Sequence, residues 1–135
     1  MAYTVKAASN TFHVKDAQAL REALEGLEII VYPVEDQSDP NYVYLVGSEK
    51  NGVWPTTRRA KGTQESETVD LLALIAPHLA SGEVAVLKQT GSLAAPRIGA
   101  LAHAVNEQGT TVRVHIDEIY ALARAVLGGN IAEDI

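Results

Sequence analysis

Apolar residues along this chain follow two spacings, which predict the segments that form strands and helices. Alternating or β-branched runs are typical of strands, and apolar residues three and four positions apart are typical of helices. The predicted strands are 9–14, 28–34, 42–46, a short 53–54, 83–88 and the two arms of a hairpin within 97–115. The strand 28–34, rich in β-branched residues, is expected to be buried, and Asn51-Gly52 predicts a turn before 53–54. The predicted helices are 16–26, which Asp16 caps and Gly26 stops, and 69–79, which Pro77 should kink or restart in its last turn. A last helix is predicted between Asp117, which can cap it, and Gly128.

The hairpin within 97–115 carries enough turn chemistry to fix its register. Its turn, Asn106-Glu107-Gln108-Gly109, matches a type I turn followed by a left-handed glycine. This register places one set of residues on the first face: Ile98, Ala100, Ala102, Ala104, Val112 and Val114. The opposite face then holds Leu101, His103, Val105, Thr111, Arg113 and His115. The alanines leave room for a helix, so we expect the helix-covered face to be the first; a slip of one residue would exchange the sets.

Strands in hairpins with helices between the groups predict an α+β fold, with an antiparallel sheet of about five to seven strands and two or three helices packed on one face. The 135 residues are the usual size of a single domain, 1–135. The last helix should bury a stripe of Ile119, Leu122, Ala123 and Val126. Segment 56–68 has no periodic apolar residue and is predicted to be a mobile loop, either functional or simply disordered; residues 130–135 are expected to form a frayed acidic tail.

Negative charge is concentrated in one third of the chain. The formal net charge is −6; residues 16–49 contain eight carboxylates and one base, Arg21, which gives −7 and leaves +1 for the rest. Such a charge argues against direct binding to a phosphate backbone. A solvated surface is one explanation. The other is a face for a basic protein partner, formed by Glu22, Glu25, Glu28, Glu35, Asp36 and Asp39.

A short basic stretch follows at 50–61. Trp54 next to Arg58 and Arg59 could stack on a nucleic-acid base and so form a secondary contact. The alternative is that Trp54 anchors this segment to the domain.

The sequence contains no motif for catalysis, for a metal or for a cofactor. Its four histidines show no zinc spacing, and it has no cysteine, no nucleophile elbow and no phosphate-binding glycine loop. We therefore expect no cofactor and no metal, and we predict that the protein is not an enzyme. One alternative stays open: a small-ligand or enzymatic site on His103, Arg113 and His115, which requires a concave pocket above the hairpin.

The chain ends and hydropathy bear on location. Residues 1–6 lack the apolar stretch of a signal peptide, no run approaches the ~18 apolar residues of a membrane span, and the absence of cysteine gives no sign of an oxidising compartment. A cytoplasmic location without membrane attachment is expected.

Three stretches, 9–16, 74–87 and 104–120, together resemble small acidic proteins of phages and mobile elements, a group that overlaps anti-CRISPR-like inhibitors. The resemblance implies an inhibitor or accessory role. With the acidic face, it leads to the hypothesis of a non-enzymatic inhibitor that blocks a basic, nucleic-acid-binding effector. A homo-oligomeric accessory protein, using the exposed hairpin face or the edge at Tyr42 and Tyr44, is the other alternative.

Overall fold

The computed structural model describes residues 6–47, 54–59, 66–92 and 98–128. Its strands are β1 (Lys6–Ser9), β2 (Phe12–His13), β3 (Ile29–Pro33), β4 (Tyr42–Gly47), β5 (Thr57–Arg59), β6 (Ser66–Thr68), β7 (Val84–Ser92), β8 (Ile98–Asn106) and β9 (Thr111–His115). Its helices are α1 (Ala17–Ala23), α2 (Leu71–Ile75), the 3-10 turn η1 (Ala76–His78) and α3 (Glu118–Leu127). None of the helices in these ranges is long and apolar enough to cross a bilayer.

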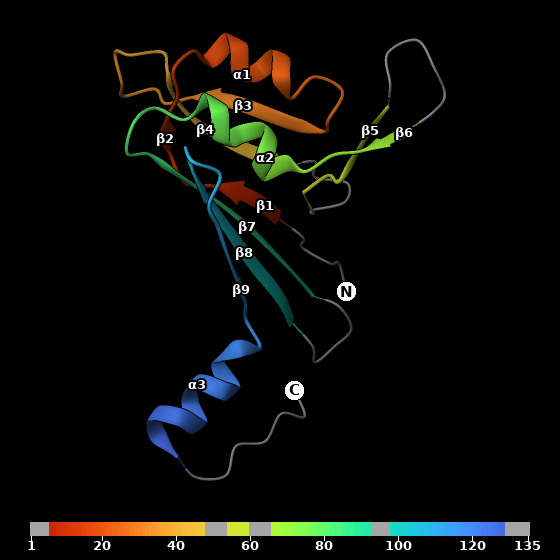
Figure 1. Ribbon diagram of the computed structural model, residues 1–135, viewed down its shortest axis with the longest axis vertical. Coiled ribbons are helices and arrows are strands. Elements are labelled where there is room, and N and C mark those ends of the chain that lie inside the picture. Colours follow the sequence, from red (N-terminus) through yellow and green to blue (C-terminus); the bar gives the residue numbers. More distant parts are fainter. Residues whose placement is uncertain (1–5, 48–53, 60–65, 93–97, 129–135) are drawn as a thin grey trace.

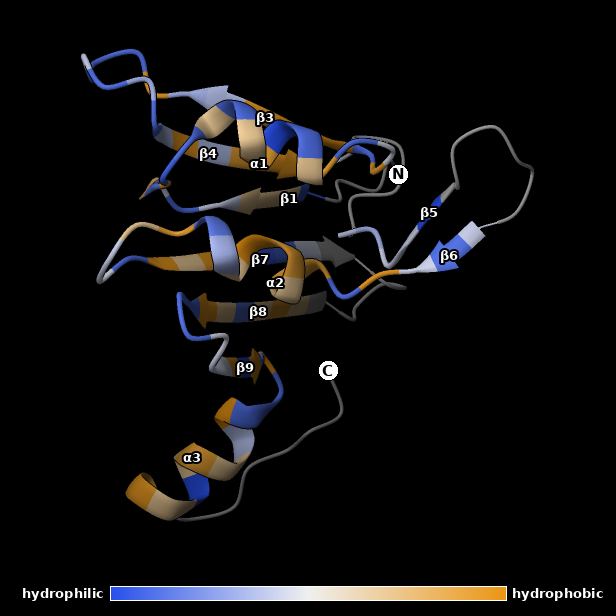
Figure 2. Ribbon diagram, turned by 45° about the horizontal axis from the view of Figure 1, so that its top comes forward, coloured by the Kyte–Doolittle hydropathy of each residue, from blue (hydrophilic) through white to orange (hydrophobic). Residues whose placement is uncertain are grey.

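Seven of the strands form one antiparallel sheet, which confirms the predicted α+β class. The order is β2-β4-β1-β7-β8-β9, with β3 on the other side of β4. Strands β1 and β2 follow one another along the same edge of β4. The two outermost strands of the sheet are therefore β3 on one side and β9 on the other. Helices α1 and α2 cover one face of this sheet, whereas α3 lies beyond β9, away from both (Figures 1 and 2).

The predicted strand 9–14 is divided into β1 and β2 by Asn10. The Asn10 side chain accepts a hydrogen bond from the backbone N–H of Val86 (2.8 Å) and donates one to the carbonyl of Val84 (3.1 Å). The side chain thereby takes the place of a strand neighbour for β7 where the ladder is interrupted. A buried backbone donor left without an acceptor would be costly, so Asn10 lets the chain bend here without leaving one.

The core lies between α1, α2 and the sheet face beneath them. Asp16 caps α1 as predicted, its carboxylate accepting from the backbone N–H of Gln18 (3.0 Å). The second helix is shorter than predicted, and Pro77 is the second residue of the 3-10 turn that follows it. The largest fully buried side chains are aliphatic apart from one phenylalanine: Phe12, Leu20, Leu45, Ile75, Leu79, Leu87, Val14, Val43 and Val105.

The hairpin register is confirmed, but the prediction of its covered face is wrong. Ala104 pairs with Val112 and Ala102 with Val114, and Gly109 has φ +82°. However, α2 lies over the opposite face, where Leu87 pairs with His103 and Val105 with Ala85. Larger buried apolar residues on that side, such as Leu87 and Val105, extend the apolar surface of the core. The first face, which carries Ala100, Ala102 and Ala104, has no helix over it in the described ranges.

Two further segments are more exposed than the sequence predicts. Strand β3 was expected to be buried, but it is an edge strand, and its residues Ile30 and Tyr32 lie on the face without helices. The predicted buried stripe of α3 is wrong as well, because this helix has no buried residue. Asp117 also forms no side-chain capping bond to α3; its carboxylate lies 3.6 Å from Nδ1 of His115.

The ends of the segment 56–68 are ordered as strands. Arg58 pairs with Glu67 in the two-stranded ladder of β5 and β6, so the prediction of a loop is wrong for 57–59 and 66–68. Strand β7 also continues four residues beyond its predicted end. The centre of the predicted loop, the turn at Asn51-Gly52, Val53 and the tail 130–135 lie outside the described residues.

Candidate functional site

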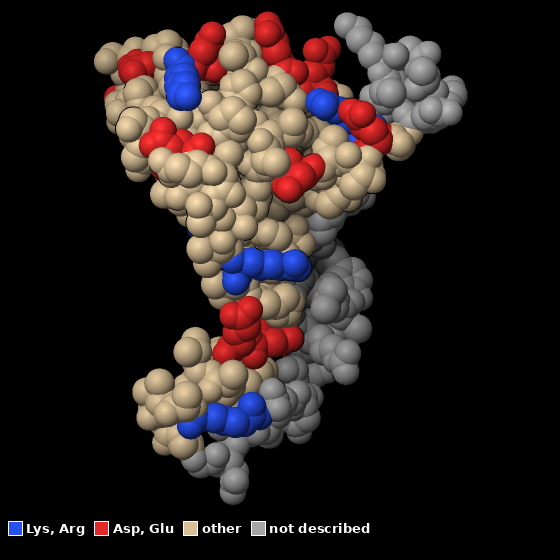
Figure 3. Space-filling view, in the orientation of Figure 1, with Lys and Arg blue, Asp and Glu red and all other residues tan. Residues whose placement is uncertain are grey.

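Five exposed carboxylates surround α1 and β3. Glu22 lies on α1, Glu25 and Glu28 lie between α1 and β3, and Glu35 and Asp36 lie in the turn between β3 and β4. We call these five residues the acidic edge. They occupy the end of the molecule opposite α3, where carboxylates gather in separate groups with a basic side chain nearby (Figure 3).

Within the described ranges, no cation forms an ion pair with the acidic edge. The ion pairs within the described ranges are His13 with Asp39, Arg58 with Glu67, and His115 with Asp117, and none includes the acidic edge. Carboxylates without a paired cation keep their charge available to an incoming partner. Five of the six carboxylates predicted for a partner-binding face are thus exposed and lie outside the ion pairs of the described ranges.

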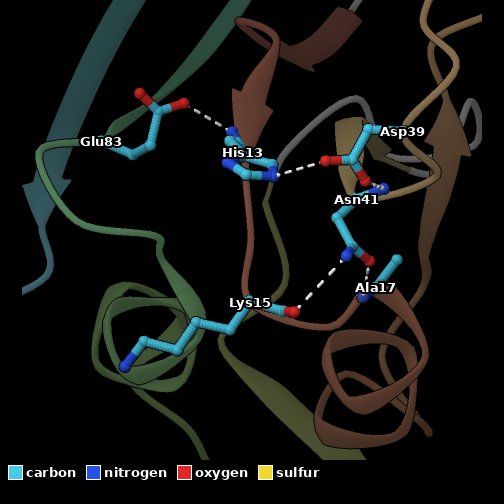
Figure 4. A network of polar contacts seen from close by, with 6 residues as sticks. All are labelled: His13, Lys15, Ala17, Asp39, Asn41 and Glu83. Carbon is cyan, nitrogen blue, oxygen red and sulfur yellow. Dashed lines mark hydrogen bonds and ion pairs between the residues drawn. The ribbon is translucent and has the colours of Figure 1, made fainter.

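Asp39, the sixth predicted residue, has a structural role instead. One carboxylate oxygen lies 3.0 Å from Nε2 of His13, and the other accepts from the backbone N–H of Asn41 (2.9 Å) (Figure 4). The His13 ring stacks on Tyr42 with centroids 4.3 Å apart. Both oxygens are engaged and the side chain is only partly exposed, so Asp39 does not belong to the acidic edge. It is part of a set of polar contacts among His13, Asp39, Asn41 and Glu83, which we call the polar clamp.

Asn41 and Glu83 complete this polar clamp. The Asn41 side chain accepts from the backbone N–H of Ala17 (2.9 Å), at the start of α1, while Glu83 accepts from the backbone N–H of His13 (2.6 Å) (Figure 4). The clamp ties the β3–β4 turn to β2, to α1 and to the segment before β7. It holds α1, which carries Glu22, against the turn that carries Glu35 and Asp36.

The proposed secondary contact through Trp54, Arg58 and Arg59 is not supported. Trp54 is buried, its indole N–H donates to the carbonyl of Lys88 (3.1 Å), and its backbone N–H donates to Gln89 (3.2 Å). A base cannot stack on a buried ring, so Trp54 is an anchor. Arg58 binds Glu67 (2.7 Å) and the carbonyl of Ala23 (3.1 Å), while the side chain of Arg59 lies outside the description.

An open pocket of about 630 Å³ lies above the hairpin, where the alternative ligand site requires one. His103 and Arg113 line it, beside apolar residues that include Trp54, Leu71 and Leu87. His115 shares the sheet face but does not line the pocket; it lies at the junction of β9 and α3. The structure therefore brings together two of the three residues predicted for this site.

The charge of His103 is set by its surroundings. Burial, and then the Arg113 guanidinium, lower the pKa of His103 below its ordinary value of 6.5. Both causes disfavour the protonated imidazole. At pH 7 the pocket thus has a neutral imidazole beside the Arg113 guanidinium, and the Asp70 side chain that caps α2 also lines it.

Neither metal chemistry nor nucleophilic catalysis has a constellation in the residues described. No group of three His, Asp or Glu residues there could hold a metal ion. The polar clamp pairs His13 with Asp39, but no hydroxyl contacts this pair among the hydrogen bonds described.

The sequence analysis missed Asn10 and Asn41, the two asparagines with the most consequential hydrogen bonds, because their partners are distant in sequence.

The described residues define an α+β fold with an acidic edge at one end and an open pocket above the hairpin. No family model matches the sequence, and no curated protein or solved structure matches the chain.

Proposed function

We propose that this protein is a non-enzymatic, protein-binding inhibitor, and that its acidic edge occupies the basic groove of a nucleic-acid-binding effector. The proposal includes an anti-defence role of the anti-CRISPR kind, as the resemblance to small phage and mobile-element proteins implies. The observation that carries it is the acidic edge: five exposed carboxylates around α1 and β3, none in an ion pair in the described ranges.

The acidic edge suits such a partner for two physical reasons. Opposite charges on two surfaces accelerate encounter and fix the register of a complex more than they add affinity. A polyanion and the acidic edge would also compete for the same lysines and arginines. Binding of the protein and binding of a nucleic acid to the effector are therefore expected to be mutually exclusive and to weaken as salt is raised.

The test is capture from a nuclease-treated lysate of a bacterial host, with the protein immobilised. We expect wild type to retain proteins that a short DNA or RNA duplex then elutes. Glu22→Lys with Glu25→Lys should abolish this retention, because an attractive contact becomes repulsive. Asp39 is left unchanged, since its replacement would break the polar clamp.

A matched control makes the same change in charge elsewhere. Glu107→Lys with Asp117→Lys also replaces two negative charges by two positive ones, at the hairpin turn and at the start of α3. This control should retain the captured proteins. Retention by the Glu22 and Glu25 variant, or the absence of any protein that nucleic acid elutes, would show that the inhibitor proposal is wrong.

The pocket above the hairpin favours a second candidate function, the binding of a small acidic ligand. Its mostly apolar lining suits a hydrophobic body, and Arg113 suits a carboxylate. Asp70 also lines the pocket, where its carboxylate accepts from the backbone N–H of Ala73 (3.3 Å). His103, neutral at pH 7, would add a hydrogen bond without adding charge.

His103 reports on this pocket by NMR. In Arg113→Gln we expect the pKa of His103 to rise but to stay below 6.5, because burial is the larger cause of its depression. Since the folded-state pKa is the lower one, protonation disfavours folding, and stability should fall as the pH drops below 6.5. Benzoate should shift the His103 ring signals of wild type at pH 7 and leave those of Arg113→Gln unchanged; equal shifts in both would exclude an Arg113-dependent site.

A further inference from the structure

Helix α3 presents an apolar stripe that no described element covers. Ile119, Leu122 and Val126 lie on one side of the helix and are 56 %, 60 % and 78 % exposed. Figures 1 and 2 both place α3 beyond β9, away from the core and from the other helices. An amphipathic helix normally buries such a stripe against another element, so this one lacks its complement within the described chain.

The complement is present on the adjacent sheet face. Val112 and Val114 on β9 are 62 % and 51 % exposed, and they lie beside the small residues Ala102 and Ala104 of β8. A shallow apolar groove of about 190 Å³ runs over Ala100, Ala102, Val114 and Ile116. We call this surface, Ala100 to Ala104 with Val112 to Ile116 on the face opposite α2, the alanine face. Small residues let a helix approach a sheet closely.

We propose that two copies of this chain form a twofold dimer in which α3 of each copy lies on the alanine face of the other. A twofold contact uses the same surface on both subunits, so one arrangement covers both helices and both faces. Strand β9 is the last strand of the sheet in the described residues. The axis would therefore lie alongside an edge strand, which proteins commonly cover.

The exposed apolar area fits an interface of ordinary size. A fully buried aliphatic side chain removes roughly 60–120 Å² of apolar surface from water, so the partly exposed set at this end offers roughly 250–500 Å² per chain. A stable interface buries about 800 Å² per partner, part of it polar. The alanines, the stems of polar residues and the β9 edge add to the apolar set. That set is Val112, Val114, Ile116, Ile119, Leu122, Val126 and Leu127.

The charge distribution favours a second copy at this end in particular. Each chain carries a net charge of −6, which opposes self-association. The acidic edge lies around α1 and β3, across the whole sheet from β9. Contact through α3 therefore keeps the two acidic edges apart and leaves both accessible, independently of what the acidic edge binds.

The test is the mass of the full chain in solution, measured by sedimentation equilibrium at several concentrations. We expect wild type to reach twice 14.4 kDa. Leu122→Glu should raise the dimer dissociation constant at least about 100-fold, because it places a charge in an apolar contact. Ala121→Glu, on the opposite side of α3, should leave the dimer intact. A monomeric wild type, or dissociation by Ala121→Glu as readily as by Leu122→Glu, would overturn the proposal.

A complementation experiment distinguishes helix-on-face contact from other dimers. Val114→Lys on the alanine face should also be monomeric by itself. A mixture of Val114→Lys and Leu122→Glu contains one unaltered α3 and one unaltered face, and its second contact would pair Glu with Lys. We therefore expect the mixture to dimerise, with circular dichroism confirming that each variant is folded. A mixture that stays monomeric although wild type dimerises would exclude α3 on the alanine face.

Discussion

Phe12→Ala is expected to lower the free energy of unfolding by about 3–5 kcal/mol, the usual range for removing a buried phenylalanine. Phe12 is 1 % exposed on β2, pairs with Val43 and is the largest of the fully buried side chains. Since domains are commonly stable by about 5–15 kcal/mol, this single change should remove a large part of the total.

Urea denaturation followed by circular dichroism measures this effect. Ile30→Ala is the appropriate control, because Ile30 lies on the uncovered face and is 52 % exposed. We expect the control to cost about 1 kcal/mol or less, since little of its surface leaves water on folding. Equal losses for Phe12→Ala and Ile30→Ala would contradict the assignment of the core to the face beneath α1 and α2.

Asn41→Ala is expected to cost about 1–3 kcal/mol, the range for a buried donor that loses its acceptor. The Asn41 side chain accepts from the N–H of Ala17 at 2.9 Å, and Ala17 is buried at the start of α1. Alanine would leave this N–H without a partner and would also remove the weaker 3.4 Å bond to the carbonyl of Lys15. Helix α1 should therefore loosen from the β3–β4 turn, which thermal denaturation and hydrogen exchange of α1 amides would show.

Asn41→Asp separates the two hydrogen bonds of Asn41. It keeps an oxygen for the Ala17 N–H and adds a negative charge at the N-terminus of a helix, where the dipole favours it. We expect this variant to lose less stability than Asn41→Ala. If both variants lose the same amount, the bond to Ala17 does not carry the stabilisation.

Local chemistry in the sequence was sufficient for the hairpin turn and for the cap of α1. The Asn106–Gly109 turn fixed a register that the structure reproduces pair by pair, and Asp16 caps α1 through its own carboxylate. These features depend on residues within a few positions of one another, so the sequence contains their cause. The α+β class follows from the same local information.

The pattern could not show which apolar surfaces meet. The periodicity identified the two hairpin faces, but α2 covers the face that carries His103 and Arg113, and the α3 stripe that it predicted to be buried is exposed. An amphipathic pattern indicates that a surface needs covering without naming what covers it. In the proposed dimer, the apolar stripe of α3 is buried against a second copy of the chain and not against its own sheet.

The long-range polar contacts were equally inaccessible from the sequence. Asn10 binds Val86, and Asn41 binds Ala17, across sequence separations of 76 and 24 residues. In the candidate site, the five carboxylates of the acidic edge were recognised by their concentration in one third of the chain. Asp39 was assigned to the same face because its position in the sequence gives no sign of its bond to His13.

The central claim is that the acidic edge binds a basic protein, and the dissociation constant of the captured partner tests it most directly. Titration calorimetry should compare wild type, Glu22→Lys with Glu25→Lys, and the control Glu107→Lys with Asp117→Lys at one salt concentration. The account predicts at least about 100-fold weaker binding for the first variant and less than about threefold for the control. Equal dissociation constants for the two variants would contradict it.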